Sequence, residues 1–313
     1  MIPRAGWPAG SRGRVIAAPA KVNLFLELLN KRPDGYHELQ TLLAPIDLYD
    51  TLEIQPRDDG ELVLTCDAPD IPTGPENLVC IAAAALRTAF GVTEGASIHL
   101  TKRIPHQAGL GGGSSDAAST LLALNAVWNL NRPIEELAPV AAKIGSDVAA
   151  FLHAGPTWCT GRGEIVESIP AAKPLDLVIV KPPFGLSTAE VYRNARLPEN
   201  PTPGAALRAA LAAGDAVAVG RLTHNRLQPP AFALQPLANW VYDALLAQSP
   251  LSALLSGSGS CVFAIARDRR DALRIARLAE PLLTARVPDC RLFVVRTLVP
   301  NPDADSERLS AGF

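Results

Sequence analysis

A run of small, flexible residues between positions 105 and 116 has the composition of an anion-binding loop. The run reads Pro105, His106, Gln107, Ala108, Gly109, Leu110, Gly111, Gly112, Gly113, Ser114, Ser115 and Asp116. Glycine permits positive φ and lets the backbone approach a ligand closely. A helix that begins here would direct free N–H groups and the positive end of its dipole at an anion. The run therefore predicts a phosphate-binding loop.

Two familiar phosphate motifs do not match this run. A P-loop requires Lys and then Ser or Thr after its last glycine, but Ser114 and Ser115 follow without a lysine. A dinucleotide fingerprint requires Gly or Ala at the sixth position from Gly109, where this chain has Ser114. A glycine-rich turn with Ser114 as an ordinary helix cap is the simpler alternative, although such a cap needs one glycine rather than four.

Three more polar residues lie where ordered elements are expected to begin. Lys21 and Asn23 share one face of a predicted strand, and Asp147 lies at the start of a predicted helical turn. Solvation of the first two side chains, and a capping role for Asp147 worth about 1 kcal/mol, would explain them without any chemistry. The residues alone leave both interpretations open.

The elements that must position these residues follow from the periodicity of apolar side chains. The first half is predicted to hold strands at 14–29, 39–54 and 97–101 and helices at 77–90, 117–130 and 133–145. Residues 58–60 are expected to turn the chain into a hairpin with residues 62–64, and residues 156–169 to form a second hairpin. The glycine run then lies between a strand and a helix.

The second half alternates strands and helices after a candidate linker at 171–174. Strands are predicted at 177–180, 261–265 and 292–295, and helices at 188–192, 204–213, 237–247 and 270–283. Such alternation indicates an α+β sheet covered by helices. We expect two domains, residues 1–168 and 169–313, with a loose arm at 1–13 and a frayed tail after Pro300.

Composition narrows the class of protein. The 313 residues are 48% hydrophobic and 19% charged, which is typical of a chain that buries a sizeable core. The net charge of −2 provides no general basic field for nucleic acid or a membrane surface. Five widely spaced cysteines without a metal-binding pattern indicate reduced thiols. No signal peptide or membrane span is expected, so we expect a cytoplasmic protein.

Three segments, in this order, resemble the motifs of the GHMP kinases. They are residues 19–24, 109–115 and 256–259. Two further segments, residues 32–41 and 144–148, resemble the branch of this superfamily that phosphorylates 4-diphosphocytidyl-2-C-methyl-D-erythritol. The resemblance extends from about residue 14 to 298, and the Pro-Asp-Gly-Tyr-His sequence that ends at His37 is its most specific part.

The resemblance implies a fold and a reaction. The fold is α+β and has two domains, an N-terminal ribosomal-S5-like α/β domain and a C-terminal ferredoxin-like α+β domain, with the active site in the cleft. The reaction is ATP-dependent phosphorylation of the substrate's 2-hydroxyl in non-mevalonate isoprenoid biosynthesis, with Mg²⁺ bridging the ATP phosphates through unidentified protein ligands. The expected partner is a small cytidine diphosphate-linked alcohol, not nucleic acid or a membrane, and the expected assembly is a monomer or weak homodimer.

The resemblance also assigns roles to residues. Asp147 would accept or orient the proton of the attacking hydroxyl, and Lys21 would keep that carboxylate ionised. Residues 105–115 would hold the ATP phosphates, with Asn77 near the ATP base. The expected substrate contacts are Asn23 with the polyol, Tyr36, His37 and Tyr192 with cytidine, and Lys102 and Thr188 with the diphosphate region. A core position for the Tyr192 ring and a solvated Lys102 remain alternatives.

Three positions depart from the family's pattern. Gln107 stands where glycine is usual, and Ala149 and Ala150 replace a usual Pro-Phe pair. Positive φ costs a non-glycine residue about 1 kcal/mol or more. With Gln107 in this place, it is therefore open whether the first loop turn keeps the family's usual backbone conformation.

Two other functions remain as alternatives. One is a GHMP kinase for another small alcohol such as mevalonate or homoserine, which Tyr36 and His37 disfavour. The other is an RNA-binding module on an S5-like fold, which the net charge disfavours.

Overall fold

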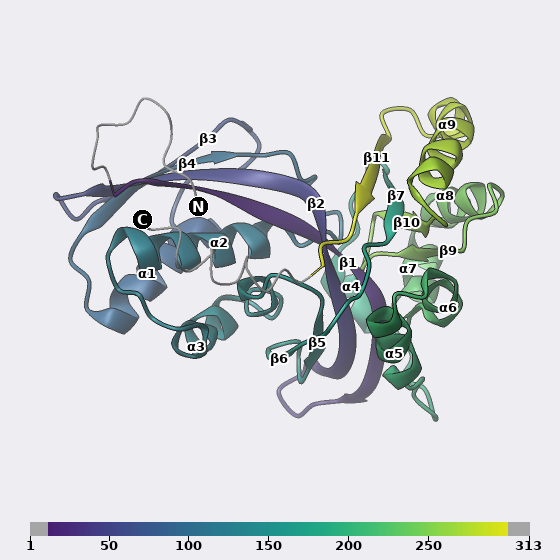
Figure 1. The fold of residues 1–313 in the computed structure, drawn as a ribbon, viewed down its shortest axis with the longest axis horizontal. Coiled ribbons are helices and arrows are strands. Elements are labelled where there is room, and N and C mark those ends of the chain that lie inside the picture. Colours follow the sequence, from purple (N-terminus) through teal and green to yellow (C-terminus); the bar gives the residue numbers. More distant parts are fainter. Residues whose placement is uncertain (1–11, 300–313) are drawn as a thin grey trace.

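The computed structural model describes residues 12–299, which form two β-sheets with helices packed against them (Figure 1). The arm expected at 1–13 lies almost entirely outside the described residues, and so does the tail after Pro300. Within the described residues, no helix has the length and apolar character needed to cross a membrane. All five cysteines are free, as expected for reduced thiols.

The larger sheet is built around two long antiparallel strands, β1 and β2. Its strands are β1 (Arg14–Lys31), β2 (His37–Arg57), β3 (Leu62–Cys66), β4 (Gly95–Thr101), β5 (Thr157–Thr160), β6 (Ile165–Ser168) and β8 (His224–Asn225). The order is β3-β4-β2-β1-β8, and β5 pairs with both β2 and β6. Register shifts interrupt the β1–β2 ladder, one of them between Pro19 and Ala20. The two strands extend from the helices of the first half to the second half of the molecule (Figure 1).

The prediction of a hairpin between residues 39–54 and 62–64 is wrong. β3 pairs in parallel with β4, with Leu62 opposite Ala96, and β4 lies between β3 and β2. The turn at 58–60 therefore carries the chain past the position of β4 to the edge of the sheet. A local turn signal cannot show that a strand formed more than thirty residues later inserts beside β2. The second expected hairpin, β5 with β6, is confirmed.

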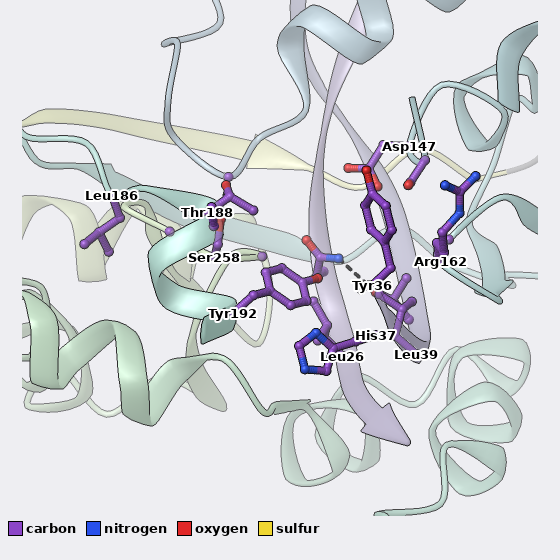
Figure 2. Close-up of a pocket in the computed structure, with 18 of the residues that line it drawn as sticks. Leu26, Tyr36, His37, Leu39, Asp147, Arg162, Leu186, Thr188, Tyr192 and Ser258 are labelled. Carbon is purple, nitrogen blue, oxygen red and sulfur yellow. Dashed lines mark hydrogen bonds between the residues drawn. The ribbon is translucent and has the colours of Figure 1, made fainter. Parts of the chain in front are cut away.

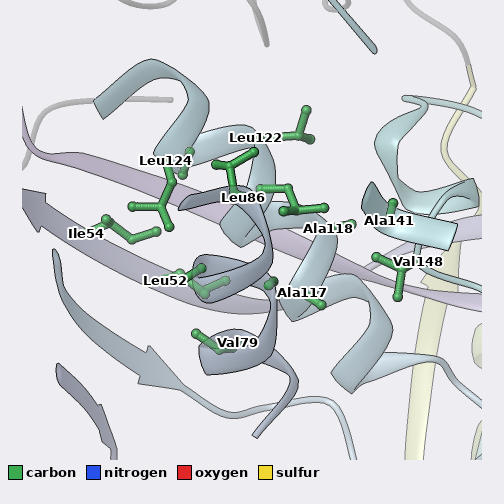
Figure 3. Close-up of a cluster of buried hydrophobic side chains, with 14 of the residues drawn as sticks. Leu52, Ile54, Val79, Leu86, Ala117, Ala118, Leu122, Leu124, Ala141 and Val148 are labelled. Carbon is green, nitrogen blue, oxygen red and sulfur yellow. The ribbon is translucent and has the colours of Figure 1, made fainter. Parts of the chain in front are cut away.

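Helices α1 (Leu78–Phe90) and α2 (Gly112–Val127) pack on this sheet, α3 (Ile134–Ile144) packs against these two helices, and a short 3₁₀ turn, η1 (Ala150–Leu152), follows. α2 begins at Gly112, five positions before the expected start at 117, so the serines of the glycine run lie inside the helix. Figure 3 shows Leu52 and Ile54 of β2 beside side chains of α1 and α2. This apolar cluster fixes the start of α2 relative to the sheet.

The smaller sheet belongs to the second half and is antiparallel throughout, in the order β11-β7-β10-β9. Its strands are β7 (Asp176–Lys181), β9 (Ser252–Leu255), β10 (Val262–Ile265) and β11 (Arg291–Arg296). The helices of this half are α4 (Thr188–Asn194), α5 (Ala205–Ala213), α6 (Ala216–Leu222), α7 (Gln228–Leu234), α8 (Pro236–Leu246) and α9 (Arg269–Arg286). The sequence did not predict β8, β9, α6 or α7, but the α+β class is confirmed.

The two halves share an apolar core. Val22 and Phe25 of β1 pack in one cluster with Ile179 of β7 and Phe263 of β10. β8, which comes from the second half of the chain, pairs with β1 and so joins the larger sheet. The candidate linker is also held, because Ala171 packs against the shared cluster. This shared core fixes the facing surfaces of the two halves.

Candidate active site

A cavity of about 1170 Å³ opens where β1, the glycine loop (residues 105–111 with the first turn of α2) and α4 meet (Figure 2). The loop between β9 and β10, residues 256–261, lines it from the second half; we call it the Gly/Ser loop. Among the described residues that line the cavity, Asp147 is the single carboxylate. The lining cations are Lys21, Lys31, Arg162 and Arg193. A cavity with this charge balance suits an anionic ligand.

Lys21 and Asp147 meet in this cavity. The Lys21 Nζ lies 3.6 Å from Asp147 Oδ2, and it also donates hydrogen bonds to Asn23 Oδ1 (2.5 Å) and to the Gly109 carbonyl (3.0 Å). Burial lowers the pKa of Lys21, while the charge of Asp147 acts in the opposite direction. The Asp147 side chain is 35% exposed and the Lys21 side chain 5%. The amine is thus fixed between a carboxylate that faces the cavity and the glycine loop.

Asn23 supports this lysine from the same face of β1. Its Nδ2 donates to Thr41 Oγ1 (2.8 Å), which in turn donates to the Phe25 carbonyl (2.6 Å). The amide is therefore oriented with its oxygen toward Lys21. Simple solvation does not explain these two residues, because Lys21 is 4% and Asn23 3% exposed.

The backbone of the glycine loop has the conformation that its composition predicts. Gly109 and Gly111 have φ values of +72° and +69°, and the Leu110 carbonyl accepts a hydrogen bond from Lys21 N (2.9 Å). A Cβ on Gly109 would lie 2.0 Å from the Ser256 carbonyl oxygen. Ser114 is not the helix cap of the simpler alternative, because the N-cap is Gly111, which supplies no side-chain hydrogen bond. The first N–H groups of α2 are thus available to an anion.

The two departures from the family's pattern are accommodated. Gln107 has φ +49°, so the first loop turn keeps a left-handed conformation without a glycine. Its side chain packs beside Gly185 of the second half, where a Cβ would lie 2.7 Å from Gln107 Oε1. Ala149 and Ala150 are buried just after Asp147.

Aromatic side chains gather at the other end of the cavity. The His37 and Tyr192 rings have centroids 5.6 Å apart, and the Arg162 guanidinium lies 5.0 Å from the centroid of the exposed Tyr36 ring. Burial and the charge of Lys31 lower the pKa of His37. Burial and the charge of Asp147 raise the pKa of Tyr192. A neutral imidazole and a protonated phenol suit an uncharged heterocycle better than a phosphate.

Sequence reasoning missed Arg162, which lies beside Tyr36 and Asp147 in Figure 2. It lies at the tip of the β5–β6 hairpin, between Gly161 and Gly163. Its only signal was a cation between two glycines at a predicted turn.

Two expected substrate residues line the cavity from the second half. Thr188, at the start of α4, has its Oγ1 2.8 Å from Ser258 Oγ of the Gly/Ser loop. Tyr192 lines the cavity and also packs against the apolar cluster of this half, so its ring has the core position of the alternative and still borders the cavity.

Ten expected site residues lie outside the residues that line the cavity, namely Asn77, Lys102, Pro105, His106, Ala108, Leu110, Gly112, Gly113, Ser114 and Ser115. The Lys102 amine is buried between Asp50 and Asp116, so it is not a solvated strand residue. The Asn77 side chain caps α1 by accepting from Val79 N. Pro105 precedes His106, whose Nδ1 lies 3.4 Å from Asp70 Oδ2. Lys102 still approaches the loop, because a Cβ on Gly112 would lie 3.4 Å from its Nζ.

Protein ligands for a metal are sparse. Within residues 12–299, no group of three or more His, Cys, Asp or Glu side chains could hold a metal ion. The Ser115 Oγ and Asp116 Oδ1 atoms, in the first turn of α2, are buried without a hydrogen-bond partner. Hard oxygen atoms of this kind are the ligands that Mg²⁺ prefers.

Comparison with known proteins gives a consistent picture. The chain matches the family model "GHMP kinases N terminal domain" over residues 77–155 and the model "GHMP kinases C terminal" over residues 207–279. It is 43% identical over 281 residues to 4-diphosphocytidyl-2-C-methyl-D-erythritol kinase of Pelotomaculum thermopropionicum, covering 88% of this chain and 98% of that protein. It is 38% identical to the enzyme of the same name from Brevibacillus brevis, covering 90% and 96%.

Solved structures agree with the sequence relatives. A crystal structure of 4-(cytidine 5'-diphospho)-2C-methyl-D-erythritol kinase superposes with a TM-score of 0.76 at 35% identity, over 92% of this chain and all of that one. Homoserine kinase from Cytophaga hutchinsonii superposes with a TM-score of 0.75 at 21% identity, over 95% of this chain and 98% of that one, which shows the fold alone.

Proposed function

The chain belongs to the 4-diphosphocytidyl-2-C-methyl-D-erythritol kinase family of the GHMP kinases, and we propose that its cavity transfers the terminal phosphoryl group of ATP to the 2-hydroxyl of that cytidyl substrate. The expected two-domain GHMP kinase fold is confirmed by the family models and the structural match. The observation that carries the proposal is the Lys21–Asp147 pair, which lies beside the glycine loop in a cavity with aromatic side chains at its other end.

Phosphoryl transfer asks a protein mainly for positioning and charge compensation. The Asp147 carboxylate faces the cavity and would take the proton of the attacking hydroxyl. The Lys21 amine, 3.6 Å away, would hold that carboxylate in place beside the attacking hydroxyl. The same amine offsets negative charge that develops between the attacking oxygen and the phosphoryl group.

ATP would bind through backbone atoms rather than through a P-loop lysine. The left-handed glycines of the loop leave space beside the first turn of α2, and the N–H groups there would receive the phosphates. Mg²⁺, when bound with ATP, would neutralise charge on the phosphate oxygens. Ser115 Oγ and Asp116 Oδ1 fit as protein ligands, because both are buried oxygens without a partner.

The opposite end of the cavity would receive the cytidine group. The Tyr36 ring is exposed for stacking on the base, and His37 and Tyr192 supply polar groups that are neutral near pH 7. Arg162, beside Tyr36, would bind the diphosphate or the base. The proposal also includes the assembly and the location of the protein. It acts in the cytoplasm as a monomer or weak homodimer, and its partner is this small molecule and not nucleic acid.

A coupled ADP-release assay tests the function. ADP release should require 4-diphosphocytidyl-2-C-methyl-D-erythritol, and neither mevalonate nor homoserine should replace it. Turnover of either small alcohol at a comparable rate would contradict the proposal, and so would salt-sensitive RNA binding without any ATP turnover.

A further inference from the structure

We propose that Asn225 is a positioning residue for phosphoryl transfer, because it holds the Gly/Ser loop against Lys21 and Asn23. The inference rests on the function proposed above. Asn225 lies in β8, a two-residue strand, and it does not line the cavity that holds Lys21. Its effect would therefore pass through the loop rather than through contact with a substrate.

The Asn225 side chain is buried and fully committed to backbone groups. Its Nδ2 donates to the carbonyls of Leu255 and Gly257, both at 2.8 Å, and its Oδ1 accepts from Leu227 N at 2.9 Å. Asn225 is 5% exposed. A buried amide with all of these bonds made fixes the backbone on either side of Ser256.

The Gly/Ser loop in turn contacts the reacting centre. Ser256 Oγ donates to the Gly109 carbonyl at 2.9 Å, and the same carbonyl accepts from Lys21 Nζ at 3.0 Å. Gly257 packs on the lysine itself, because a Cβ there would lie 3.2 Å from Asn23 Oδ1 and 3.4 Å from Lys21 Nζ. The loop thus forms one wall around the catalytic amine.

Asn225 has a rigid support on the strand that also carries Lys21. It pairs with Leu26 of β1, and Arg226 N donates to the Leu26 carbonyl at 2.8 Å. Glu27, fully buried in β1, accepts two hydrogen bonds from the Arg226 guanidinium, at 2.7 and 2.8 Å. β1 therefore holds Lys21 directly and holds the opposing loop through Asn225, which sets the distance between them.

Asn225→Asp tests this role with little change of shape. A carboxylate cannot donate to the Leu255 and Gly257 carbonyls, and its charge repels them, so the loop should move away from Lys21. We expect kcat to fall by about 10- to 100-fold, since small misplacements of reacting groups have costs of that order. The KM values for ATP and for the cytidyl substrate should change by less than about threefold, because the binding residues remain.

Asn125→Asp is the matched control. Asn125 is also a buried amide, and its side chain exchanges two hydrogen bonds with the Arg132 backbone, at 3.0 and 2.9 Å. It lies near the far end of α2, about 20 Å along the helix from Gly112. Its substitution should lower the melting temperature to a similar degree but leave kcat within about twofold. An equal loss of kcat in both variants, or an unchanged kcat in Asn225→Asp, would overturn the inference.

Hydrogen exchange tests the inference without any substrate. Asn225→Asp should speed amide exchange across residues 255–261, whereas Asn125→Asp should not, and unchanged exchange there would refute the role. If the Asn225→Asp protein does not fold, Asn225→Ser replaces it in the test. The serine keeps one donor and adds no charge, so this variant should show the same effects in smaller measure. A wild-type protein that phosphorylates nothing would contradict the proposed function alone, because the exchange result still decides this inference.

Discussion

Lys21 is the side chain on which the proposed chemistry depends most, since one amine contacts a carboxylate, an amide oxygen and the glycine loop. Burial removes the solvent that would otherwise screen the amine, so its attraction for the Asp147 carboxylate is stronger than at a surface. In the proposed reaction the lysine therefore acts through its fixed position, and Asp147, which lines the cavity, is the group that meets the hydroxyl.

Asp147→Asn separates proton transfer from ATP binding. The amide keeps the shape of the side chain but cannot accept a proton at neutral pH, so kcat should fall by about 10²- to 10⁴-fold. The dissociation constant of ATP should change little, because the glycine loop is untouched. Steady-state kinetics together with an ATP titration check this prediction, and turnover at the wild-type rate would remove Asp147 from its role.

Tyr36→Ala probes recognition of the base. Stacking on an aromatic ring contributes about 1 to 3 kcal/mol per base, so KM for the cytidyl substrate should rise by about 5- to 150-fold while KM for ATP stays the same. Tyr36→Phe retains the ring and should behave like the wild type. An unchanged KM in Tyr36→Ala would argue against stacking.

Lys21 and Asn23 could be singled out from the sequence because they lie in one extended segment, residues 19–24, and share one face of a predicted strand. Arg162 could not be, since a single cation in a hairpin turn looks like any solvated residue until the fold places Tyr36 5.0 Å away. Lys102 was expected near the substrate, but two buried carboxylates occupy its amine.

At the scale of elements, the first turn of α2 combines ligand binding with a buried charge cluster. Burial raises the pKa of Asp116 to about 7, as does nearby Asp50, while Lys102 acts against this rise. Burial alone would lower the pKa of Lys102, but Asp116 and Asp50 raise it. The cluster lies directly behind the glycine loop and couples the stability of this turn to pH.

The sign of that coupling follows from the two states of the chain. The carboxyl group ionises near pH 4 when unfolded but keeps its proton to about pH 7 when folded. Its contribution to stability is therefore present at low pH and is lost as pH rises from about 4 to about 7. Asp116→Asn removes this loss, so its free energy of unfolding relative to wild type should increase by about 1 to 3 kcal/mol between pH 5 and pH 8. Denaturant melts at the two pH values check this, and a pH-independent difference would contradict it.

The longer elements were predictable because their signals are local. Asn77 and Gly91 delimit α1 as capping residues, and the alternation in β1 indicates a strand. The order of β3 and β4 was not predictable, because pairing between distant strands leaves no local pattern. β8 was missed for a different reason: two residues are too short for any period, and their position depends on Glu27 and on pairing with β1.

The whole molecule places its candidate active site between two halves that share one apolar cluster in addition to the clusters within each half. Apolar residues of β1 pack with those of β7 and β10. β8 comes from the second half of the chain but pairs with β1 of the larger sheet. The domain boundary at 168/169 remains a proposal about the chain, since side chains on both sides of it contribute to one cluster.

This shared core predicts one cooperative unfolding transition. Exposing the core of either half would expose apolar surface of the other, so neither half should unfold alone. Differential scanning calorimetry of the full chain should give one transition whose calorimetric and van't Hoff enthalpies agree. Two resolved transitions would show instead that the halves are energetically independent.

The central claim is that the amine of Lys21 and the carboxylate of Asp147 direct a phosphoryl group to one hydroxyl of the cytidyl substrate. Phosphorus NMR of the product formed from ATP and 4-diphosphocytidyl-2-C-methyl-D-erythritol tests it most directly. The account predicts a new phosphomonoester on the 2-hydroxyl with the diphosphate intact. A phosphate on any other hydroxyl, or a cleaved diphosphate, would contradict it.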